Sequence, residues 1–248
     1  MAANNLVCNE SKTDVIQFSS RFQKHDLLPH INIGESEVTL TSSVRNLGVT
    51  LDSHLTMNLH VNQLCKSASF SLRRVGQVRR YLDDSSGEKL VHALITSKLD
   101  QRNGMLYVLP DEELSKIQRI QNSAARIVSR TKRCEYITPV LRKLHWLPIK
   151  KRIICKILLI VYKALHGLAP EYISKLLQPY KPTRALRSGS KQQLKVPLSR
   201  TKYYGGRAFS IYAPKYWNTL PLYIKQSATL DSFKKELKTF LFCNEIRF

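Results

Sequence analysis

The chain has 248 residues, of which 43% are hydrophobic, and it carries 40 Lys and Arg against 18 Asp and Glu, a formal net charge of +22. This length and apolar content are sufficient for a buried core, which excludes an intrinsically disordered chain. A positive charge this large exceeds what solubility requires and indicates a polyanionic partner, of which nucleic acid is the first candidate.

The sequence contains no pattern typical of secretion or of a membrane protein. Its five cysteines are odd in number and widely spaced, which is typical of reduced thiols. The start, "MAANNLVCNE", lacks the basic residue and apolar run of a secretory signal. The most apolar stretch, 153–165, is short and interrupted by Lys156 and Lys163, which favours a buried helix over a membrane span. We therefore expect an intracellular protein, nuclear or cytoplasmic, with no membrane partner.

The first predicted elements are short strands, and helices follow. Residues 1–55 contain the strand-like stretches "DVIQF" and "VRNLGVTLD", separated by "HDLLPHINIGESE", which is rich in turn formers. Apolar residues at steps of three and four then predict helices at 58–82, from 87 to about 99, and at 111–129, 149–166, 171–177 and 230–242. The fold class expected is mainly α, with a small β-rich N-terminal fragment.

Between the last two of these helices the pattern changes. The stretch "QPYKPTRALRSGSK", residues 178–191, is rich in proline, serine and basic residues and predicts a basic linker. The stretch "QLKVPLSRTKYYGGRAFSIYA" after it predicts a C-terminal β-hairpin around Gly205 and Gly206. The predicted divisions of the chain are therefore 1–55, 56–177, the linker 178–191, and a basic hairpin plus closing helix at 192–248.

The positive charge is concentrated in one part of the chain. Residues 1–113 hold 12 basic and 13 acidic residues, whereas residues 114–230 hold 24 basic and 2 acidic residues. No acidic residue occurs between Glu171 and Asp231. Such one-sided charge is not typical of an ordinary surface, on which both signs are mixed.

The helix predicted at 111–129 carries the first candidate nucleic-acid surface. Its apolar residues fall on one side, and its acidic residues are confined to the first turn, where the helix dipole favours anions. The other side, continued just beyond the helix, carries basic residues at steps of three and four: Lys116, Arg119, Arg126, Arg130 and Arg133. Two interpretations remain open, an ordinary solvated face and a surface that follows a phosphate backbone.

The basic stretch 181–207 carries the second candidate surface. Aromatic rings beside arginines can stack on unpaired bases, although in a hairpin such rings belong to the core equally often. The candidate residues are Arg184, Arg187, Lys191, Tyr203, Tyr204 and Arg207. Trp146 and Trp217, each followed by Leu-Pro, are interpreted as packing anchors.

Residues 81–84 spell Y-x-D-D, the tetrapeptide that in reverse transcriptases carries two metal-binding carboxylates. A catalytic Y-x-D-D lies on the turn of a β-hairpin between apolar strands. Here an amphipathic helix precedes it and "SSGE" follows, which favours a helix start capped by Asp84 or Ser85 with Glu88 close behind. We predict no metal site in the chain, because the seven histidines form no ligand motif either.

Several long segments resemble, in order, the C-terminal part of Jockey-like non-LTR retrotransposon reverse transcriptases. They are "NESKTDVIQF", "VRNLGVTLD", "LVHALITSKLDQRNGMLYVLP", "IQRIQNSAARIVSRT", "ITPVLRKLHWLPIKKRI", "YKALHGLAPEYI" and "YGGRAFSIYAPKYWNTLP". The resemblance implies that 1–55 is the end of the palm and that 56–177 is a helical, thumb-like bundle.

The resemblance also assigns the first motifs. "N-x-x-K-T" is similar to the fourth palm motif, whose lysine would be Lys12, and "LGV" at 47–49 is similar to the primer grip. In that family the carboxylate hairpin precedes the fourth motif, so Asp83 and Asp84 follow it too late to be catalytic. Lys12 without a metal site is otherwise interpreted as a structural or solvated lysine.

The function implied is that of a nucleic-acid-binding C-terminal fragment of an RNA-directed DNA polymerase, which grips template and primer or element RNA. We expect the chain alone to be inactive as a polymerase, to need no cofactor and to bind no small-molecule substrate, because Mg²⁺ is required only by the full-length enzyme. Two alternatives remain open. The first is a domesticated nucleic-acid-binding or interaction protein. The second is an expressed transposon remnant without function.

Overall fold

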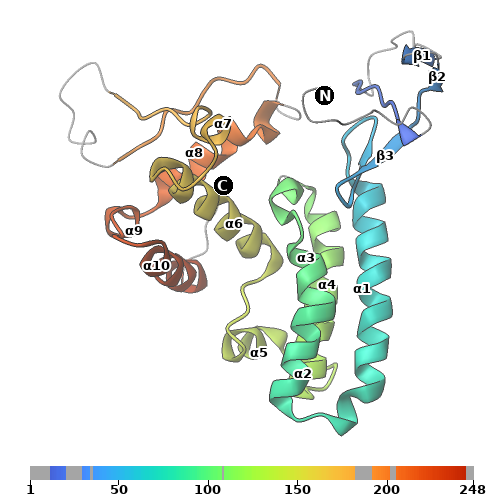
Figure 1. Cartoon of the computed structure of the whole chain (residues 1–248). Helices are drawn as coiled ribbons and strands as arrows, with labels where there is room; N and C mark the ends of the chain where they lie inside the picture. Colours follow the sequence, from blue (N-terminus) through green and yellow to red (C-terminus); the bar gives the residue numbers. More distant parts are fainter. Residues whose placement is uncertain are drawn as a thin grey trace, which may run out of the picture. The chain divides into compact units, whose positions relative to one another are not determined.

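Figure 1 shows the computed structural model of the chain, which describes residues 12–20, 30–33, 36–107, 109–181, 192–201 and 205–243. The chain divides into two compact units, Met1–Ser67 and Ala68–Phe248. Helix α1 (Asn58–Val78) contains the boundary between them.

The described residues of the first unit form two antiparallel sheets of two strands each. In one sheet β1 (His30–Ile33) pairs with β2 (Ser36–Thr39). In the other, β3 (Ser43–Asn46) pairs with β4 (Val49–Asp52), with Ser43 opposite Asp52. Strands this short are not stable alone, so this unit depends on further packing.

The strand predictions for this unit are partly confirmed. "VRNLGVTLD" forms the β3–β4 hairpin, and the positive φ angles of Leu47 and Gly48 give its turn the backbone twist that suits a two-residue hairpin. "DVIQF" contributes only an isolated bridge between Val15 and Leu40. "HDLLPHINIGESE", predicted as a separator, contains β1, because pairing with β2 satisfies its backbone despite the polar composition.

The connection from β4 to α1 is fixed by Asp52. Its two carboxylate oxygens accept hydrogen bonds from the backbone amides of Thr56 and Met57, at 2.9 and 2.8 Å. Burial raises the pKa of Asp52, but these amides outweigh burial and leave the pKa below its ordinary value. In the first turn of α1, His60 Nδ1 accepts a hydrogen bond from the backbone amide of Thr50 at 3.4 Å.

The regular secondary structure of the second unit is helical among its described residues. After α1 the elements are a 3₁₀ turn (Arg79–Tyr81), α2 (Asp84–Val91), a π-helical turn (His92–Thr96), α3 (Ser97–Asp100), a 3₁₀ turn (Asn103–Leu106), α4 (Asp111–Ser129), α5 (Ile137–Lys143), α6 (Ile149–Leu165), α7 (Glu171–Ser174), a 3₁₀ turn (Gly205–Arg207), α8 (Phe209–Thr219), α9 (Leu222–Lys225) and α10 (Leu230–Cys243). The mainly α fold with a small N-terminal β part, expected from the sequence, is confirmed.

Among the described helices, α4, α6, α7 and α9 each begin directly after a proline. Pro110, Pro148, Pro170 and Pro221 all have φ between −52° and −59° and extended ψ, which the pyrrolidine ring favours. The proline carbonyl then accepts the first helical hydrogen bonds, as from Arg152 to Pro148 at 2.9 Å. The prolines therefore mark helix starts in this chain.

Helix α6 forms the core of the second unit, packing against α4, α8 and α10. Its residues Ile157, Leu158 and Val161 are buried. The ring of Tyr162 stacks on Phe233 of α10, with ring centroids 4.2 Å apart, and its hydroxyl donates to the Ser227 carbonyl at 2.8 Å. The apolar stretch expected to be a buried helix is therefore the centre of the unit.

Trp146 and Trp217 are buried, which confirms their interpretation as packing anchors. Each indole N–H has a partner inside the fold. Trp146 Nε1 donates to Glu88 Oε1 at 3.2 Å, and Trp217 Nε1 donates to the Gln192 carbonyl at 2.9 Å. The rings thus contribute both apolar area and a fixed orientation.

The prediction of a C-terminal β-hairpin is wrong. Gly205–Arg207 forms a 3₁₀ turn, and the expected second strand is helix α8. The two glycines favoured a hairpin locally, but helical spacing buries Tyr216 and Trp217 on the core side of α8. Tertiary burial therefore outweighs local propensity here.

The predicted linker is described only at its start. Residues 178–181 pair with 192–195, since the Tyr180 amide donates to the Gln193 carbonyl at 2.9 Å and the Lys195 amide donates to the Gln178 carbonyl at 2.8 Å. Residues 182–191 lie outside the described residues.

Candidate nucleic-acid interface

Helix α4 has the amphipathic arrangement expected from its sequence. It spans Asp111–Ser129, as predicted, and Ile117, Ala124 and Val128 on its apolar side are buried. The opposite side was predicted to present five basic residues to a phosphate backbone. The structure separates these five residues by what their side chains contact.

One of the five forms an ion pair, and two are exposed. Lys116 Nζ donates to Glu113 Oε1 at 2.7 Å and so compensates a buried carboxylate in the first turn of α4. Arg119 and Arg133 are exposed, and within the described part of the chain neither side chain has a hydrogen-bond or ion-pair partner. Only these two arginines of the predicted face are fully available to a ligand.

The other two bind main-chain carbonyls. Arg126 Nη2 donates to the Glu135 carbonyl at 3.0 Å, and Arg126 Nε donates to the Lys132 carbonyl at 3.4 Å, so this side chain holds the loop after α4. Arg130 caps α4 with a positive φ of 54°, and its Nη2 donates to the Leu82 carbonyl at 3.1 Å. Both arginines therefore have structural contacts that their spacing in the sequence does not reveal.

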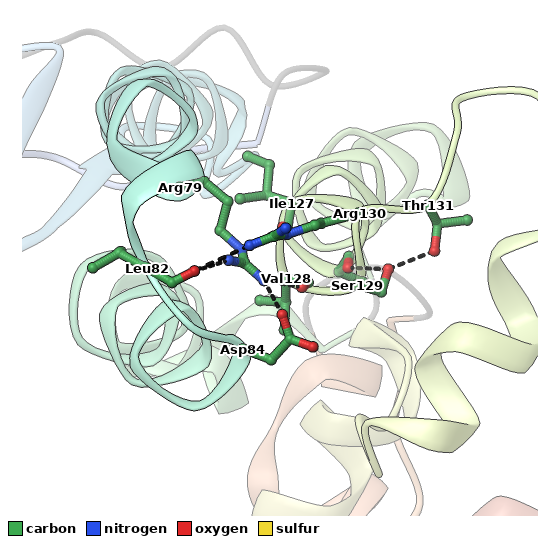
Figure 2. A network of polar contacts seen from close by, with 9 residues as sticks. Arg79, Leu82, Asp84, Ile127, Val128, Ser129, Arg130 and Thr131 are labelled. Carbon is green, nitrogen blue, oxygen red and sulfur yellow. Dashed lines mark hydrogen bonds and ion pairs between the residues drawn. The ribbon is translucent and has the colours of Figure 1, made fainter.

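Arg79, which the sequence did not single out, makes the most extensive contacts at this end of α4 (Figure 2). Its guanidinium is buried, with the residue only 6% exposed. Nε donates to the Ile127 carbonyl at 2.9 Å and Nη2 donates to the Val128 carbonyl at 2.8 Å. These carbonyls belong to the last turn of α4, where helix geometry leaves acceptors without a partner and the dipole favours a cation.

The remaining donors of Arg79 fix the turn that carries the Y-x-D-D tetrapeptide. Arg79 Nη1 donates to the Leu82 carbonyl at 2.6 Å, and Nη2 forms an ion pair with Asp84. Arg79, Arg126 and Arg130 all bind carbonyls around this end of the helix and are termed the α4-end arginines.

The helix start predicted at the Y-x-D-D tetrapeptide is confirmed, because α2 begins at Asp84. The cap prediction is wrong by one residue, since Asp83 is the N-cap and Asp84 is engaged by Arg79. Hydrogen bonding to the Ser86 side chain lowers the pKa of the Asp83 carboxyl. Both carboxylates therefore have structural roles at a helix start, and neither lies on a hairpin turn.

Helix α1 presents a second basic surface, which the sequence reasoning missed. Ala68, Leu72 and Val75 on one side of this helix are buried. The opposite side within the second unit, continued into the 3₁₀ turn, is exposed and is termed the α1 face; its residues are Phe70, Arg73, Arg74, Gln77, Arg80 and Tyr81. These residues recur at steps of three and four, so the helical period was the signal that could have revealed them.

The α1 face combines cations with exposed aromatic rings. Phe70 is 55% exposed and Tyr81 is 74% exposed. The guanidinium carbon of Arg74 lies 5.7 Å from the Phe70 ring centroid, and that of Arg80 lies 4.7 Å from the Tyr81 ring centroid. No acidic residue occurs from 53 to 82, so the charge of this face is not compensated by its own helix. Arginines beside open aromatic rings are typical of surfaces that contact phosphates and bases.

Of the other residues predicted to bind nucleic acid or to match the fourth palm motif, the structure describes only two. Arg207 is half-buried in the 3₁₀ turn before α8, and Lys12 is exposed. The other candidates lie outside the described residues; they are Arg184, Arg187, Lys191, Tyr203 and Tyr204.

No group of three His, Cys, Asp or Glu side chains among the described residues is arranged to hold a metal ion. No helix in that part of the chain has the length and apolar character needed to cross a membrane.

Comparisons of the chain with protein-family models, curated proteins and solved structures found no match. The α1 face and the exposed arginines Arg119 and Arg133 are therefore interpreted from their own chemistry.

Proposed function

We propose that the chain binds nucleic acid through the α1 face, as the C-terminal part of a Jockey-like non-LTR retrotransposon reverse transcriptase. The observation that supports this proposal best is the α1 face itself, where three exposed arginines and two exposed aromatic rings share one side of a helix without an acidic residue. The ordered resemblance of the sequence segments supports the same class of protein.

The chemistry of the α1 face suits a single-stranded or partly unpaired nucleic acid. Guanidinium groups bind phosphate oxygens through paired N–H donors, which fix orientation as well as supply charge. An exposed ring can stack on a base whatever its identity, and one such contact contributes roughly 1 to 3 kcal/mol. The proposed ligand is therefore RNA or an RNA/DNA hybrid, bound without strict sequence preference.

The proposal is tested by measuring the affinity of the purified chain for a labelled single-stranded RNA and for an RNA/DNA duplex, over a series of salt concentrations. Phosphate contacts release counterions, so log K should fall linearly with log salt on both ligands. The double variant Phe70→Ala with Tyr81→Ala removes the rings and keeps all three arginines. It should weaken binding to the single strand by roughly tenfold or more, and to the duplex by less.

A matched control removes two exposed rings elsewhere, Tyr136→Ala with Tyr172→Ala, whose side chains are 90% and 70% exposed. Equal weakening by both double variants would refute stacking at the α1 face. Affinity that does not change with salt would refute phosphate binding altogether.

The proposed assignment also predicts no polymerase activity for this chain. On a primed RNA template with Mg²⁺ or Mn²⁺, we expect no nucleotide incorporation, because Asp83 and Asp84 serve the start of α2. Incorporation that is abolished by Asp83→Asn with Asp84→Asn would contradict this assignment.

A further inference from the structure

The two exposed aromatic rings of the α1 face are its first and last residues. Phe70 lies within α1, and Tyr81 ends the 3₁₀ turn that continues this helix. Each residue adds about 1.5 Å of length to an α-helix and about 2.0 Å to a 3₁₀ helix, so the two rings lie roughly 18 Å apart along the helix. A single base therefore cannot contact both rings.

Each ring is paired with an arginine of the same face. The guanidinium carbon of Arg74 lies 5.7 Å from the Phe70 ring centroid, and that of Arg80 lies 4.7 Å from the Tyr81 ring centroid. A flat ring has two faces, and an arginine over one of them leaves the other for a ligand. Because Phe70 and Tyr81 remain 55% and 74% exposed, each ring with its arginine forms a stacking site for one unpaired base.

The surface between the two rings is suited to a sugar-phosphate chain. Arg73 and Gln77 lie there, both exposed, and among the described residues neither side chain has a hydrogen-bond or ion-pair partner. The guanidinium can bind phosphate oxygens, and the amide offers both donors and an acceptor. Asp83 and Asp84 follow directly after Tyr81, so the surface available to an anionic strand ends near this ring.

The distance between the rings indicates the length of strand that joins them. Successive stacked nucleotides of one strand rise about 3.4 Å, so two bases about 18 Å apart are roughly five nucleotides apart, and an extended strand spans this distance in fewer. The bases of a duplex are paired and stacked on one another, so they are not available to either ring. The geometry therefore favours a short unpaired segment.

We propose that the α1 face binds one continuous unpaired RNA strand across both rings, with one base stacked on Phe70, a second base stacked on Tyr81, and the phosphates between them at Arg73. This inference rests on the nucleic-acid binding proposed above for the same face. The strand that links the two bases makes the second contact intramolecular, so the two stacking sites act together. A strand too short to reach both rings gains only one stacking contact.

The proposal is tested by calorimetric titration of the full chain with a dinucleotide and an octanucleotide of uridylate. The octanucleotide reaches both rings, so Phe70→Ala and Tyr81→Ala should each weaken its binding at least about fivefold. The dinucleotide occupies either ring separately, so removal of one ring should weaken its binding by no more than about twofold. Single variants that weaken the octanucleotide by no more than they weaken the dinucleotide would overturn the proposal.

Two modified octanucleotides separate the spacing of the bases from the charge of the strand. Both have the same phosphates and keep only two bases, and all their other positions are abasic. In one ligand the two bases are about five nucleotides apart, and in the other they are adjacent. The ligand with separated bases should bind at least about fivefold more tightly, and equal affinities would refute the bridging of the two rings.

Two control variants test the contact itself. Tyr81→Phe keeps the ring and should retain the affinity for the octanucleotide, whereas a loss would show that the hydroxyl and not the ring makes the contact. Tyr136→Ala removes a ring that is 90% exposed elsewhere on the second unit and should have no effect. A loss equal to that of Phe70→Ala would refute the site.

Failure of this inference can be distinguished from failure of the proposed function. If Phe70→Ala with Tyr81→Ala weakens the octanucleotide while neither single variant does, the face binds nucleic acid and only the bridging is overturned. If no ring variant and no change of salt concentration alters the affinity, the proposed function is refuted together with the bridging.

Discussion

The α4-end arginines and the arginines of the α1 face carry the same charge but differ in what they contact. The α4-end arginines direct their N–H groups at main-chain carbonyls, and Arg79 at their centre is buried. The arginines of the α1 face are exposed, and Arg74 and Arg80 lie beside the open rings of Phe70 and Tyr81. One group completes a helix end, and the other is available to a ligand.

This difference shows that regularly spaced arginines in a sequence can have either of two roles. Some bind main-chain carbonyls and stabilise the fold, and others are exposed and available to a ligand. A guanidinium has five N–H donors in a rigid plane, so it satisfies several carbonyls of a helix end at once. A lysine or glutamine cannot replace those contacts. The arginines with structural partners therefore have to be subtracted from the net charge of +22 before that charge is used as support for the proposed polyanionic partner.

The largest expected effect is that of Arg79→Leu. This change leaves the carbonyls of Ile127 and Val128 without their donor in a buried site, removes one of the two donors to the Leu82 carbonyl, and frees Asp84. We expect the free energy of unfolding to fall by about 2 to 4 kcal/mol, chiefly from the two unsatisfied carbonyls, measured by urea denaturation followed by circular dichroism.

The control for this prediction is the neighbouring Arg80→Leu, on the exposed α1 face, which should change the free energy of unfolding by no more than about 0.5 kcal/mol. A similar loss in both variants would contradict the division of the arginines into two groups.

A smaller effect is expected for Gly87→Ala in α2. A Cβ at this position would lie 3.0 Å from Arg79 Nε and 3.2 Å from Arg79 Cδ, and the hydrogen bonds of Arg79 prevent it from moving aside. Alanine ordinarily stabilises a helix, but here the crowding should outweigh that gain and lower the free energy of unfolding by about 1 to 2 kcal/mol.

The matched variant is Gly104→Ala, where no atom lies within 4 Å of the added Cβ. It should have no destabilising effect in the same urea denaturation. If Gly87→Ala instead stabilised the chain, the Arg79 side chain would not be held as described.

The smallest expected effect is a dependence of stability on pH that arises from His60. This residue is buried and uncharged, in contrast to the arginines. Burial lowers the pKa of His60 from its ordinary value of 6.5, so the folded state keeps the ring neutral and able to accept from the Thr50 amide. The unfolded state therefore takes up a proton first as the pH falls. The contribution of neutral His60 to the stability of the folded state is fully present above pH 6.5 and is lost progressively below it.

Hydrogen exchange of the Thr50 amide, corrected for the intrinsic dependence on pH, should show falling protection between pH 7.5 and 5.5. His60→Phe should remove this dependence. Protection that is independent of pH in the unmodified chain would contradict the neutral acceptor.

Much of this fold was predictable, because periodicity is strong in the long helices. The bounds of α4 follow from its apolar period, its acidic first turn and the proline before it. Helix α8 was not predictable, since the glycine pair before it and Pro214 inside it are both unfavourable to a helix, whereas the burial of Tyr216 and Trp217 depends on the tertiary structure.

The candidate site was less predictable than the fold. The period of the sequence correctly places basic residues on one side of a helix, but it does not show which carbonyls come near them. The contacts of Arg126, Arg130 and Arg79 join residues up to 49 positions apart, so they depend on tertiary structure.

The most direct test of the account compares the triple variant Arg73→Gln, Arg74→Gln and Arg80→Gln with the double variant Arg126→Gln and Arg130→Gln, measuring salt-dependent RNA affinity and the free energy of unfolding for each. For the triple variant, the slope of log K against log salt should shrink by roughly 2 to 3 units, while stability changes by less than about 0.5 kcal/mol. The double variant should lose about 1 to 2 kcal/mol of stability and change the slope by less than about 1 unit. A double variant that reduces the slope as much as the triple, or a triple variant that leaves it unchanged, would contradict the assignment of nucleic-acid binding to the α1 face.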